Sequence, residues 1–305
     1  MRNADFGLRI YLSNIHHRQQ TPAPDNTAIR QSANHAAPRR NSVTHHLRLW
    51  LASARYSLVR AMMFRGDFLL WSAVEFAWMS VNVLLIEIVF QHTQNLAGWS
   101  KNEMLLLVGT AMLVQRLQMG FFWTNLFEIG RNVRSGAFDF YLIQPGRTLF
   151  LVSNRKLDPD GLINSFVAIG VIYYAARQLG LALTPGGVFL YAVLLLCGLV
   201  VHYSVLLLVA SATFWIVKTE GIEGSYFTLM EFGRLPRSAF HRVAAEIAFV
   251  YLLPAVIVTN VPASALLGRL EWGQAAWLVL LAAGWFAAAV AVFHRGLRRY
   301  TSASS

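Results

Sequence analysis

The sequence predicts an all-α polytopic membrane protein, with six transmembrane helices preceded by an amphipathic helix at the membrane interface. Two observations carry this prediction. Six apolar stretches, each about the length needed to cross a bilayer, lie between Phe68 and Phe293. The lysine and arginine residues between them fall almost entirely in alternate connections, which is the pattern that sets the orientation of a membrane protein.

The composition also favours lipid as the surrounding medium. Only 13% of the residues are charged and 56% are hydrophobic, whereas a soluble domain carries about 25% charged residues. The net charge of +11 would suit a nucleic-acid-binding protein if it formed a continuous basic face. Here it lies in the N-terminal segment and in the predicted cytoplasmic connections, so we attribute it to membrane topology and expect no nucleic-acid partner.

Residues 1–44 are predicted to form a disordered polar tail, and residues 45–305 the membrane domain. The tail is not a secretory signal peptide, because it has no apolar core of about 7–15 residues near its start. We interpret the histidines of this region as part of a flexible polar segment rather than as a metal site. The single cysteine, Cys197, excludes an intrachain disulfide and a cysteine-rich metal site.

Each predicted span is an apolar run. The six runs cover about residues 68–90, 104–123, 161–180, 188–217, 244–261 and 275–293. Arg177 interrupts the outer end of the third run, and the fourth is long enough to tilt. Pro254 removes a backbone hydrogen bond and is expected to kink the fifth. Pro262 and Gly268 belong to a short outer segment that can dip back into the membrane.

The orientation follows from counting cations at the two sides. With the N-terminus inside, the inner flanks hold sixteen cationic residues and the outer connections three. The inner residues are Arg48, Arg55, Arg60, Arg65, Arg131, Arg134, Arg147, Arg155, Lys156, Lys218, Arg234, Arg237, Arg242, Arg295, Arg298 and Arg299. The outer residues are Lys101, Arg177 and Arg269. Both termini are therefore expected in the cytoplasm.

An amphipathic helix is predicted over residues 47–65. Its apolar residues recur at helical spacing: Leu47, Trp50, Leu51, Ala54, Leu58 and Met62. A basic amphipathic helix with an aromatic residue tends to lie in the membrane interface. The alternative is a helical extension of the first span, but a bend at Gly66 and Asp67 favours the interfacial helix.

The longest inner connection, residues 124–160, is predicted to contain a second amphipathic helix. Leu126, Ile129 and Val133 share one face of it. Its polar residues are Glu128, Arg131 and Arg134. Such a helix between two spans suits either a cytoplasmic partner or the lipid headgroups. The carboxylates of the next inner connection, residues 218–242, are interpreted as ion-paired loop residues rather than catalytic groups.

Ionisable residues inside spans are costly and therefore count as candidate functional residues. Glu75 and Arg116 lie at matched depths, about 10 Å from the inner side of two consecutive antiparallel helices. We expect an ion pair between them that locks the two helices, in preference to a substrate contact. His202 is a weaker candidate in the fourth span.

The chain lacks the sequence motifs of the common catalytic sites. It has no Gly-x-x-x-x-Gly-Lys-Ser/Thr phosphate loop, no His-Glu-x-x-His zinc motif and no Gly-x-Ser-x-Gly nucleophile turn. The two halves show no inverted repeat of the kind common in secondary transporters. We therefore expect a non-catalytic chain that holds no cofactor or metal itself.

Several segments, spread in order over most of the chain, match one family. They are Gly66-Asp-Phe-Leu-Leu-Trp, Ala97-Gly-Trp-Ser, Gly136-Ala-Phe-Asp-Phe-Tyr-Leu-Ile-Gln-Pro, Glu231-Phe-Gly-Arg-Leu-Pro, Leu253-Pro-Ala, Leu266-Leu-Gly and Gly296-Leu-Arg-Arg-Tyr. From about Leu47 onward the chain thus resembles the permease subunits of ABC-2-type transporters, in a bacterial family of ABC transport-system permeases. After Pro236 it departs from the family, which tends to have an aromatic-proline pair there.

The resemblance implies an exporter subunit in the bacterial inner membrane. A coupling helix around residues 125–144 would seat in a separate ATPase subunit, which would hold the ATP and Mg²⁺. A second permease, identical or different, would complete the complex. The inner-loop motif would comprise Glu231, Phe232, Gly233, Arg234 and Pro236.

Three other functions remain open from the sequence: an ATP-independent transporter or channel, an intramembrane lipid-modifying enzyme, and a membrane scaffold. The first needs ionisable groups along a midplane path, and only Glu75 and Arg116 come close. The second needs a polar cluster at one depth, which the sequence does not reveal.

Overall fold

The computed structural model describes residues 43–144, 146–216, 222–240 and 254–300. Its contacts divide the chain into residues 1–45 and residues 46–305, and the fold described below is that of the second unit. The predicted polar tail and residues 244–253 of the predicted fifth span lie outside the described residues.

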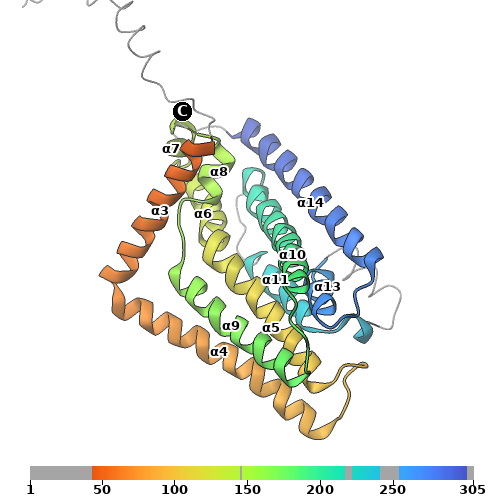
Figure 1. Cartoon of the computed structure of the whole chain (residues 1–305). Helices are drawn as coiled ribbons and strands as arrows, with labels where there is room; N and C mark the ends of the chain where they lie inside the picture. The colour runs from red at the N-terminus through yellow and green to blue at the C-terminus, as the bar shows by residue number, and fades with distance from the viewer. Residues whose placement is uncertain (1–42, 145, 217–221, 241–253, 301–305) are drawn as a thin grey trace, which may run out of the picture. The chain divides into compact units, whose positions relative to one another are not determined.

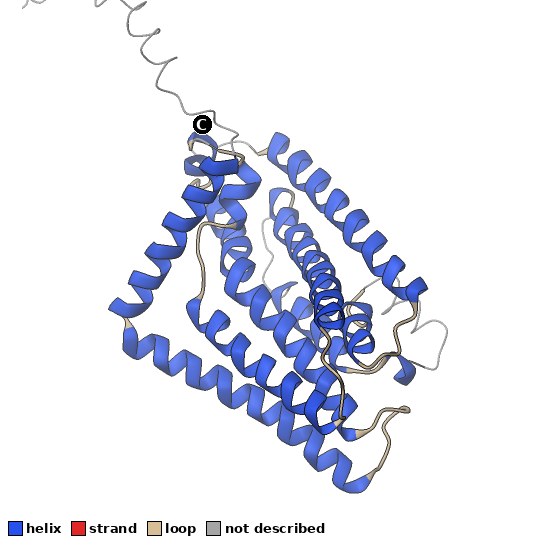
Figure 2. Cartoon of the chain, in the orientation of Figure 1, coloured by secondary structure: helices blue, strands red, loops and turns tan. Residues whose placement is uncertain are grey.

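The described part of the chain is helical and contains no β-strand (Figure 2). The α-helices are α3 (Val43–Met63), α4 (Arg65–His92), α5 (Lys101–Gln118), α6 (Thr124–Arg134), α7 (Asp139–Ile143), α8 (Thr148–Ser153), α9 (Pro159–Gln178), α10 (Pro185–Ser211), α11 (Ile222–Glu231), α13 (Ile257–Leu266) and α14 (Trp272–Arg299). The short helices are the π-helix η1 (Met119–Trp123) and the 3-10 helices η2 (Ala212–Phe214), η3 (Phe232–Arg234) and η4 (Arg237–Ala239). The all-α prediction is confirmed.

Among the described residues, four helical segments are long and apolar enough to cross a membrane. They are Arg65–His92, Lys101–Arg134, Pro185–Phe214 and Trp272–Arg299, and they match the first, second, fourth and sixth predicted spans. The protein is therefore a multi-pass membrane protein. The 20-residue α9 occupies the position of the third predicted span, and the ten-residue α13 covers only the end of the fifth.

The junction between α3 and α4 lies slightly earlier than predicted. The helix breaks at Phe64, where φ is −107° and ψ is 48°, and Gly66 and Asp67 lie inside the first turn of α4. The chain changes direction sharply at this point (Figure 1). Ser57 of α3 accepts a hydrogen bond from the Leu157 backbone N–H at 3.0 Å, which ties α3 to the start of α9.

Two apolar clusters make up the core. One joins α6, α10, α13 and α14, with Leu126, Leu206 and Phe293 among its fully buried members. The other joins α4, α5, α9 and the start of α10, and includes Leu107 and Ile172. In Figure 1, α9 runs between α4 and α5, and α10 lies between α5 and α14.

The two ends of the helix bundle are distinguished by their contacts. At one end, called the α7 end, the ring of Phe138 beside α7 packs against Tyr300, which follows α14, with centroids 5.3 Å apart. At the opposite end, Arg269 Nη2 lies 2.6 Å from Glu103 Oε1 in the first turn of α5. Glu103 Oε2 also accepts a hydrogen bond from the Ser100 backbone N–H and so caps α5.

The second predicted span and the predicted amphipathic helix, expected as two separate elements, form one continuous helix. Helix α5 passes through η1 into α6 without a break, over Lys101–Arg134. No proline interrupts these residues, and the π-turn of η1 accommodates the change of helical phase. Single π-turns inside α-helices occur often at functional sites.

The start of α9 packs closely on this π-turn. Gly120 O accepts a hydrogen bond from the Asp158 backbone N–H at 2.9 Å. The Asn125 amide exchanges two hydrogen bonds with the Lys156 backbone, each of 2.8 Å. Burial raises the pKa of the Asp158 carboxyl, and a hydrogen bond from the Thr124 hydroxyl opposes this effect. The connection between the second and third predicted spans is therefore folded back on α6.

Candidate functional site

Glu75 of α4 and Arg116 of α5 form an ion pair inside the helix bundle. Arg116 Nη1 contacts Glu75 Oε2, and the side chains are 3% and 22% exposed, respectively. The matched depth of the two residues suggested this contact from sequence, and the structure brings them together. Asp160 also attracts Arg116 electrostatically, whereas Arg234 repels it. The pair joins two helices at a position where an isolated charge is costly.

Arg234 connects three elements that are distant in sequence. It donates hydrogen bonds to Asn82 Oδ1 of α4 at 2.7 Å and to Gln115 Oε1 of α5 at 2.9 Å. It also forms an ion pair with Glu231, at the end of α11. The family motif that contains Arg234 and Glu231 is thus a cross-link between α11 and the two helices that carry the Glu75–Arg116 pair.

Helix α13 holds the same motif from the other side. Thr259 Oγ1 donates to Gly233 O at 2.6 Å, and Asn260 Nδ2 donates to Leu235 O at 3.0 Å. Asn260 Oδ1 accepts from the Arg237 backbone N–H at 2.9 Å. A Cβ atom on Gly233 would lie 2.8 Å from a backbone oxygen, so only glycine permits this approach.

The other two motif residues extend the same contact with α13. The Phe232 side chain packs against the apolar cluster that contains α13. Pro236, with φ −68° and ψ 144°, precedes η4 in the extended conformation that proline favours.

This motif does not lie in an inner loop, contrary to the sequence prediction. Ser238 Oγ donates to Ala97 O at 2.5 Å, in the connection between α4 and α5 at the end opposite α7. Residues 222–240 therefore run through the bundle to that end. The charge of Arg234 is paired with Glu231 and bonded to α4 and α5, so this arginine is a poor indicator of sidedness.

Asn260→Ala is expected to lower the free energy of unfolding by about 1–2 kcal/mol, because it leaves two partly buried backbone groups, Leu235 O and Arg237 N–H, without their partner. Asn164→Ala is the matched control. Asn164 is equally buried, but it donates to Asp160 O of its own helix. Thermal unfolding in lipid nanodiscs measures both variants. An equal loss at the two positions would contradict the role of α13 in holding the motif.

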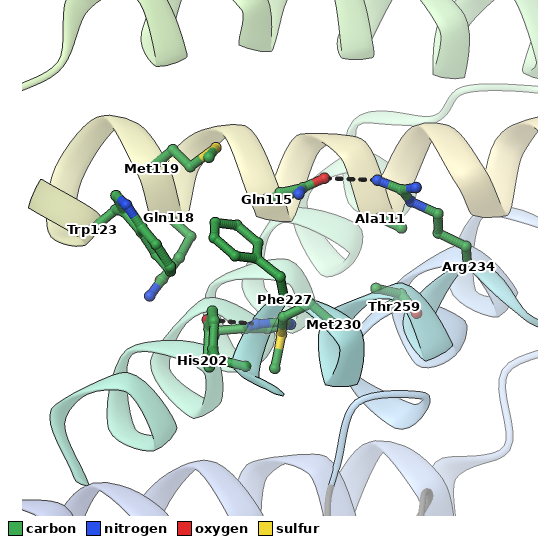
Figure 3. Close-up of a pocket in the computed structure, with 11 residues that line it drawn as sticks. Ala111, Gln115, Gln118, Met119, Trp123, His202, Phe227, Met230, Arg234 and Thr259 are labelled. Carbon is green, nitrogen blue, oxygen red and sulfur yellow. Dashed lines mark hydrogen bonds between the residues drawn. The ribbon is translucent and has the colours of Figure 1, made fainter. Parts of the chain in front are cut away.

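A small cavity lies between α5, η1, α10, α11 and α13 (Figure 3). Polar side chains from three helices converge on it, namely Gln118, His202 and Tyr226. Of these residues, the sequence indicates only His202 as a candidate, and Gln118 was not predicted. The available signal was a pair of neutral polar residues three positions apart, Gln115 and Gln118, on one face of an apolar helix.

Helix α6 uses its apolar face within this chain. Leu126 and Ile129, which were predicted to belong to a coupling surface, are buried in the core, and Val133 packs against them. Leu126 and Ile129 are therefore not available to a partner, which corrects that part of the prediction. On the other face, Glu128 pairs with Arg131 at 2.9 Å, and Arg131 is exposed.

Exposed apolar side chains lie instead on α7, beyond the end of α6. They are Phe140, Leu142 and Ile143, and Ile143 is 73% exposed. Arg134, the last residue of α6, is also exposed. In Figure 1, α7 lies at the same end as the C-terminal end of α6. A contact surface for a partner at this end would consist of α7 and the polar face of α6.

The proline residues of the fifth predicted span have different surroundings. Pro254 lies in a turn that precedes α13, and the part of the span before it is outside the described residues. Pro262 lies inside α13, not after the end of the span as predicted. It leaves Val258 O without its helical donor, and Gly198 of α10 approaches this oxygen so closely that a Cβ atom would be 2.7 Å away. A Cα–H···O contact of this kind is common between helices.

Gly268 follows the end of α13 with a φ of +69°, which favours glycine. It directs the chain from α13 to Arg269 and its contact with Glu103. Within the described residues, no group of three or more histidine, cysteine, aspartate or glutamate side chains is placed to hold a metal ion.

Comparison with known proteins identifies the family. The family model for ABC-2 family transporter proteins matches residues 76–304, which is about three-quarters of the chain. No curated protein and no solved structure matches the chain. The matched region contains the Glu231–Pro236 motif and helices α5 to α14. The chain belongs to the ABC-2 family of transporter proteins and is an ABC transporter permease.

Proposed function

We propose that this permease couples the hydrolysis of ATP on a separate ATPase subunit to the export of a substrate across the bacterial inner membrane. Membership of the ABC-2 family supports association with an ABC ATPase. ATP and Mg²⁺ would bind to that partner and not to this chain. A second permease subunit, identical or different, would complete the transport unit.

Six crossings account best for the chain in a bilayer. The four long apolar segments supply four of them. The other two would be α9 and a crossing to which α11 and α13 contribute, and α3 would lie in the interface. Without the cations of residues 218–242, the inner flanks still hold twelve cationic residues. This supports a cytoplasmic position for the α7 end and for both termini.

The observation that carries the coupling proposal is the unbroken helix from Lys101 to Arg134. At about 1.5 Å per residue, its 34 residues extend for about 50 Å. It joins the exposed α7 surface at one end to Arg116 in the middle of the bundle. A displacement of α7 by an ATPase would therefore reach the Glu75–Arg116 pair through one rigid element. ATP binding must favour one conformation over the other for transport to follow.

Ile143→Glu is expected to reduce recovery of the ATPase with the tagged permease by about tenfold, because it places a charge in the exposed apolar surface of α7. Arg131→Glu is expected to leave the ATPase bound and to uncouple hydrolysis from transport. Co-purification from gently solubilised membranes of cells that express the neighbouring genes measures ATPase recovery for both variants, and ATP hydrolysis compared with transport measures the uncoupling.

Ile216→Glu is the matched control, because Ile216 is also exposed and follows η2, which contacts α6 near the α7 end. Loss of the ATPase in this control would show that any charge at this end disturbs assembly. A stable wild-type permease that purifies without an ATPase would contradict the proposed function and favour an ATP-independent transporter.

A further inference from the structure

We propose that the cavity of Figure 3 is the polar recognition site for the transported substrate, and that the substrate is a neutral amphipath carrying a hydroxyl or amide group. Gln118 and His202 would contact that group. This inference rests on the proposed transport function and specifies the substrate class. In this structure the cavity offers space for about one such group.

Two buried side chains in the cavity wall have hydrogen-bonding atoms without partners in the described part of the chain. Gln118 is 2% exposed and forms no hydrogen bond through Oε1 or Nε2. His202 is 6% exposed and approaches Tyr226 Oη through Nδ1 at 3.3 Å, while Nε2 has no partner. Buried polar atoms are normally satisfied, so two such residues facing one cavity indicate a missing partner.

Tyr226 cannot supply all the missing contacts. The Gln118 amide interacts with the Tyr226 hydroxyl group, although the two groups do not reach full hydrogen-bond geometry in this structure. One hydroxyl group, already shared with His202, can satisfy at most one of the two amide atoms. At least one atom of Gln118 and Nε2 of His202 would still require a ligand or a water molecule.

The size of the cavity limits what fits in this conformation. Its volume of about 20 Å³ accommodates one water molecule or one hydroxyl group. A whole substrate would therefore enter only when the surrounding helices separate. Helix α11 forms one wall, through Tyr226, Phe227 and Met230, and is held to its neighbours by the contacts of Arg234.

The walls indicate an apolar or ring-shaped body on the substrate. The centroid of the Trp123 ring lies 4.2 Å from the ring centroid of Phe227 and 5.7 Å from that of Tyr226. Met119 and Met230 complete this lining. Aromatic and methionine side chains with a few placed polar groups are typical of small-molecule sites, and methionine adapts to different ligand shapes.

The charges around the cavity indicate a neutral substrate. Arg234 borders the cavity, but its charge is balanced by Glu231. The charge of Arg116, which lies on the cavity-lining helix α5, is balanced by Glu75. Neither cation is left to attract an anion, and among the described residues that line the cavity there is no carboxylate to attract a cation.

The π-turn gives a separate indication of function at this position. Helix η1 begins directly after Gln118, and the residues at its two ends, Met119 and Trp123, both line the cavity. The π-turn changes the phase of the helix at this position, so the residues after it are rotated relative to those before it. The irregular turn is thus located where it shapes the cavity wall.

The first test is whether replacing a polar cavity residue raises or lowers the apparent Tm. Gln118→Leu removes two unsatisfied polar atoms, so we expect the apparent Tm of the complex in nanodiscs to stay equal or to rise. If Gln118 instead holds a structural water network, the substitution lowers the Tm. Thr110→Val is the control, because Thr110 is buried on the same helix and bonded to Leu106 O and Tyr191 Oη. It is expected to lower the Tm.

The second test is equilibrium binding without ATP, with an alkyl glucoside below its micelle concentration as the probe. The alkyltrimethylammonium and alkyl sulfonate of the same chain length are the charged comparisons. Gln118→Leu is expected to weaken glucoside binding by about tenfold and leave the charged probes unchanged. Equal glucoside binding by wild type and variant, or preferred binding of a charged probe, would overturn the proposal. Because neither the ATPase nor transport enters this measurement, its failure leaves the coupling proposal standing.

Discussion

Glu75→Gln is expected to lower the free energy of unfolding by about 3–5 kcal/mol, because it leaves the guanidinium group of Arg116 buried without its counter-charge. The Arg116 side chain is 3% exposed and cannot recover solvation by a small movement. The attraction of Asp160 for Arg116 offsets only part of this loss, because the two side chains form no ion pair in the described structure. Chemical unfolding in mixed micelles measures the effect.

The matched control for this prediction is Glu87→Gln on the same helix. Glu87 Oε2 lies 2.7 Å from Lys101 Nζ, but the two side chains are 47% and 41% exposed. An exposed pair contributes little, so the loss is expected to stay below about 1 kcal/mol. The double variant Glu75→Gln/Arg116→Met is expected to regain most of the stability. Equal losses for Glu75→Gln and Glu87→Gln would show that the buried pair does not lock α4 to α5.

The sequence predicted the Glu75–Arg116 contact because position along two antiparallel helices determines depth. It also predicted helix over residues 124–134, but it separated this helix from the second span. Apolar periodicity identifies the buried face of a helix and does not reveal whether the axis continues through a π-turn. The same periodicity made Leu126 and Ile129 candidates for a partner surface, although they pack inside this chain.

The location of residues 222–240 was not predictable from charge counting. Charge counting takes every arginine as evidence for the side of the membrane on which its connection lies. Arg234, however, is paired with Glu231 and bonded to α4 and α5. Gln118 was not predicted as a functional residue for a related reason. A neutral amide adds little to a hydropathy average, and only its three-dimensional neighbours show that its hydrogen bonds are missing.

The structure joins the proposed functional parts through one helix. Going from α7 along α6 and α5, the helix carries Trp123 and Gln118 at the cavity, then Arg116 at the ion pair, then Gln115 at the contact with Arg234. These residues lie within nine positions. A movement of the helix would therefore change the cavity wall, the ion pair and the anchoring of α11 together. Such a shared element is what coupling between two sites requires.

Gly161→Ala is expected to lower the free energy of unfolding by about 1–3 kcal/mol and to impair transport, because it forces α9 away from the π-turn. An added Cβ atom would lie 2.9 Å from Gly120 N, 3.1 Å from Gly120 Cα and 3.2 Å from Arg116 O. All three are backbone atoms, so no side-chain rotation relieves the contact. Thermal unfolding and substrate-stimulated ATP hydrolysis by the assembled complex measure the two effects.

Gly170→Ala on the same helix distinguishes the effect of this steric contact on stability from the effect of helix propensity. A Cβ atom at Gly170 meets nothing within 4 Å, so the substitution is expected to be neutral or to stabilise α9 by up to about 1 kcal/mol. Gly120→Ala should fall between the two, because its nearest obstacle is the flexible Leu162 side chain at 2.7 Å. If Gly161→Ala proves as stable as Gly170→Ala, α9 does not rest on the π-turn. The helix would then be free to move there without passing the displacement on to α9.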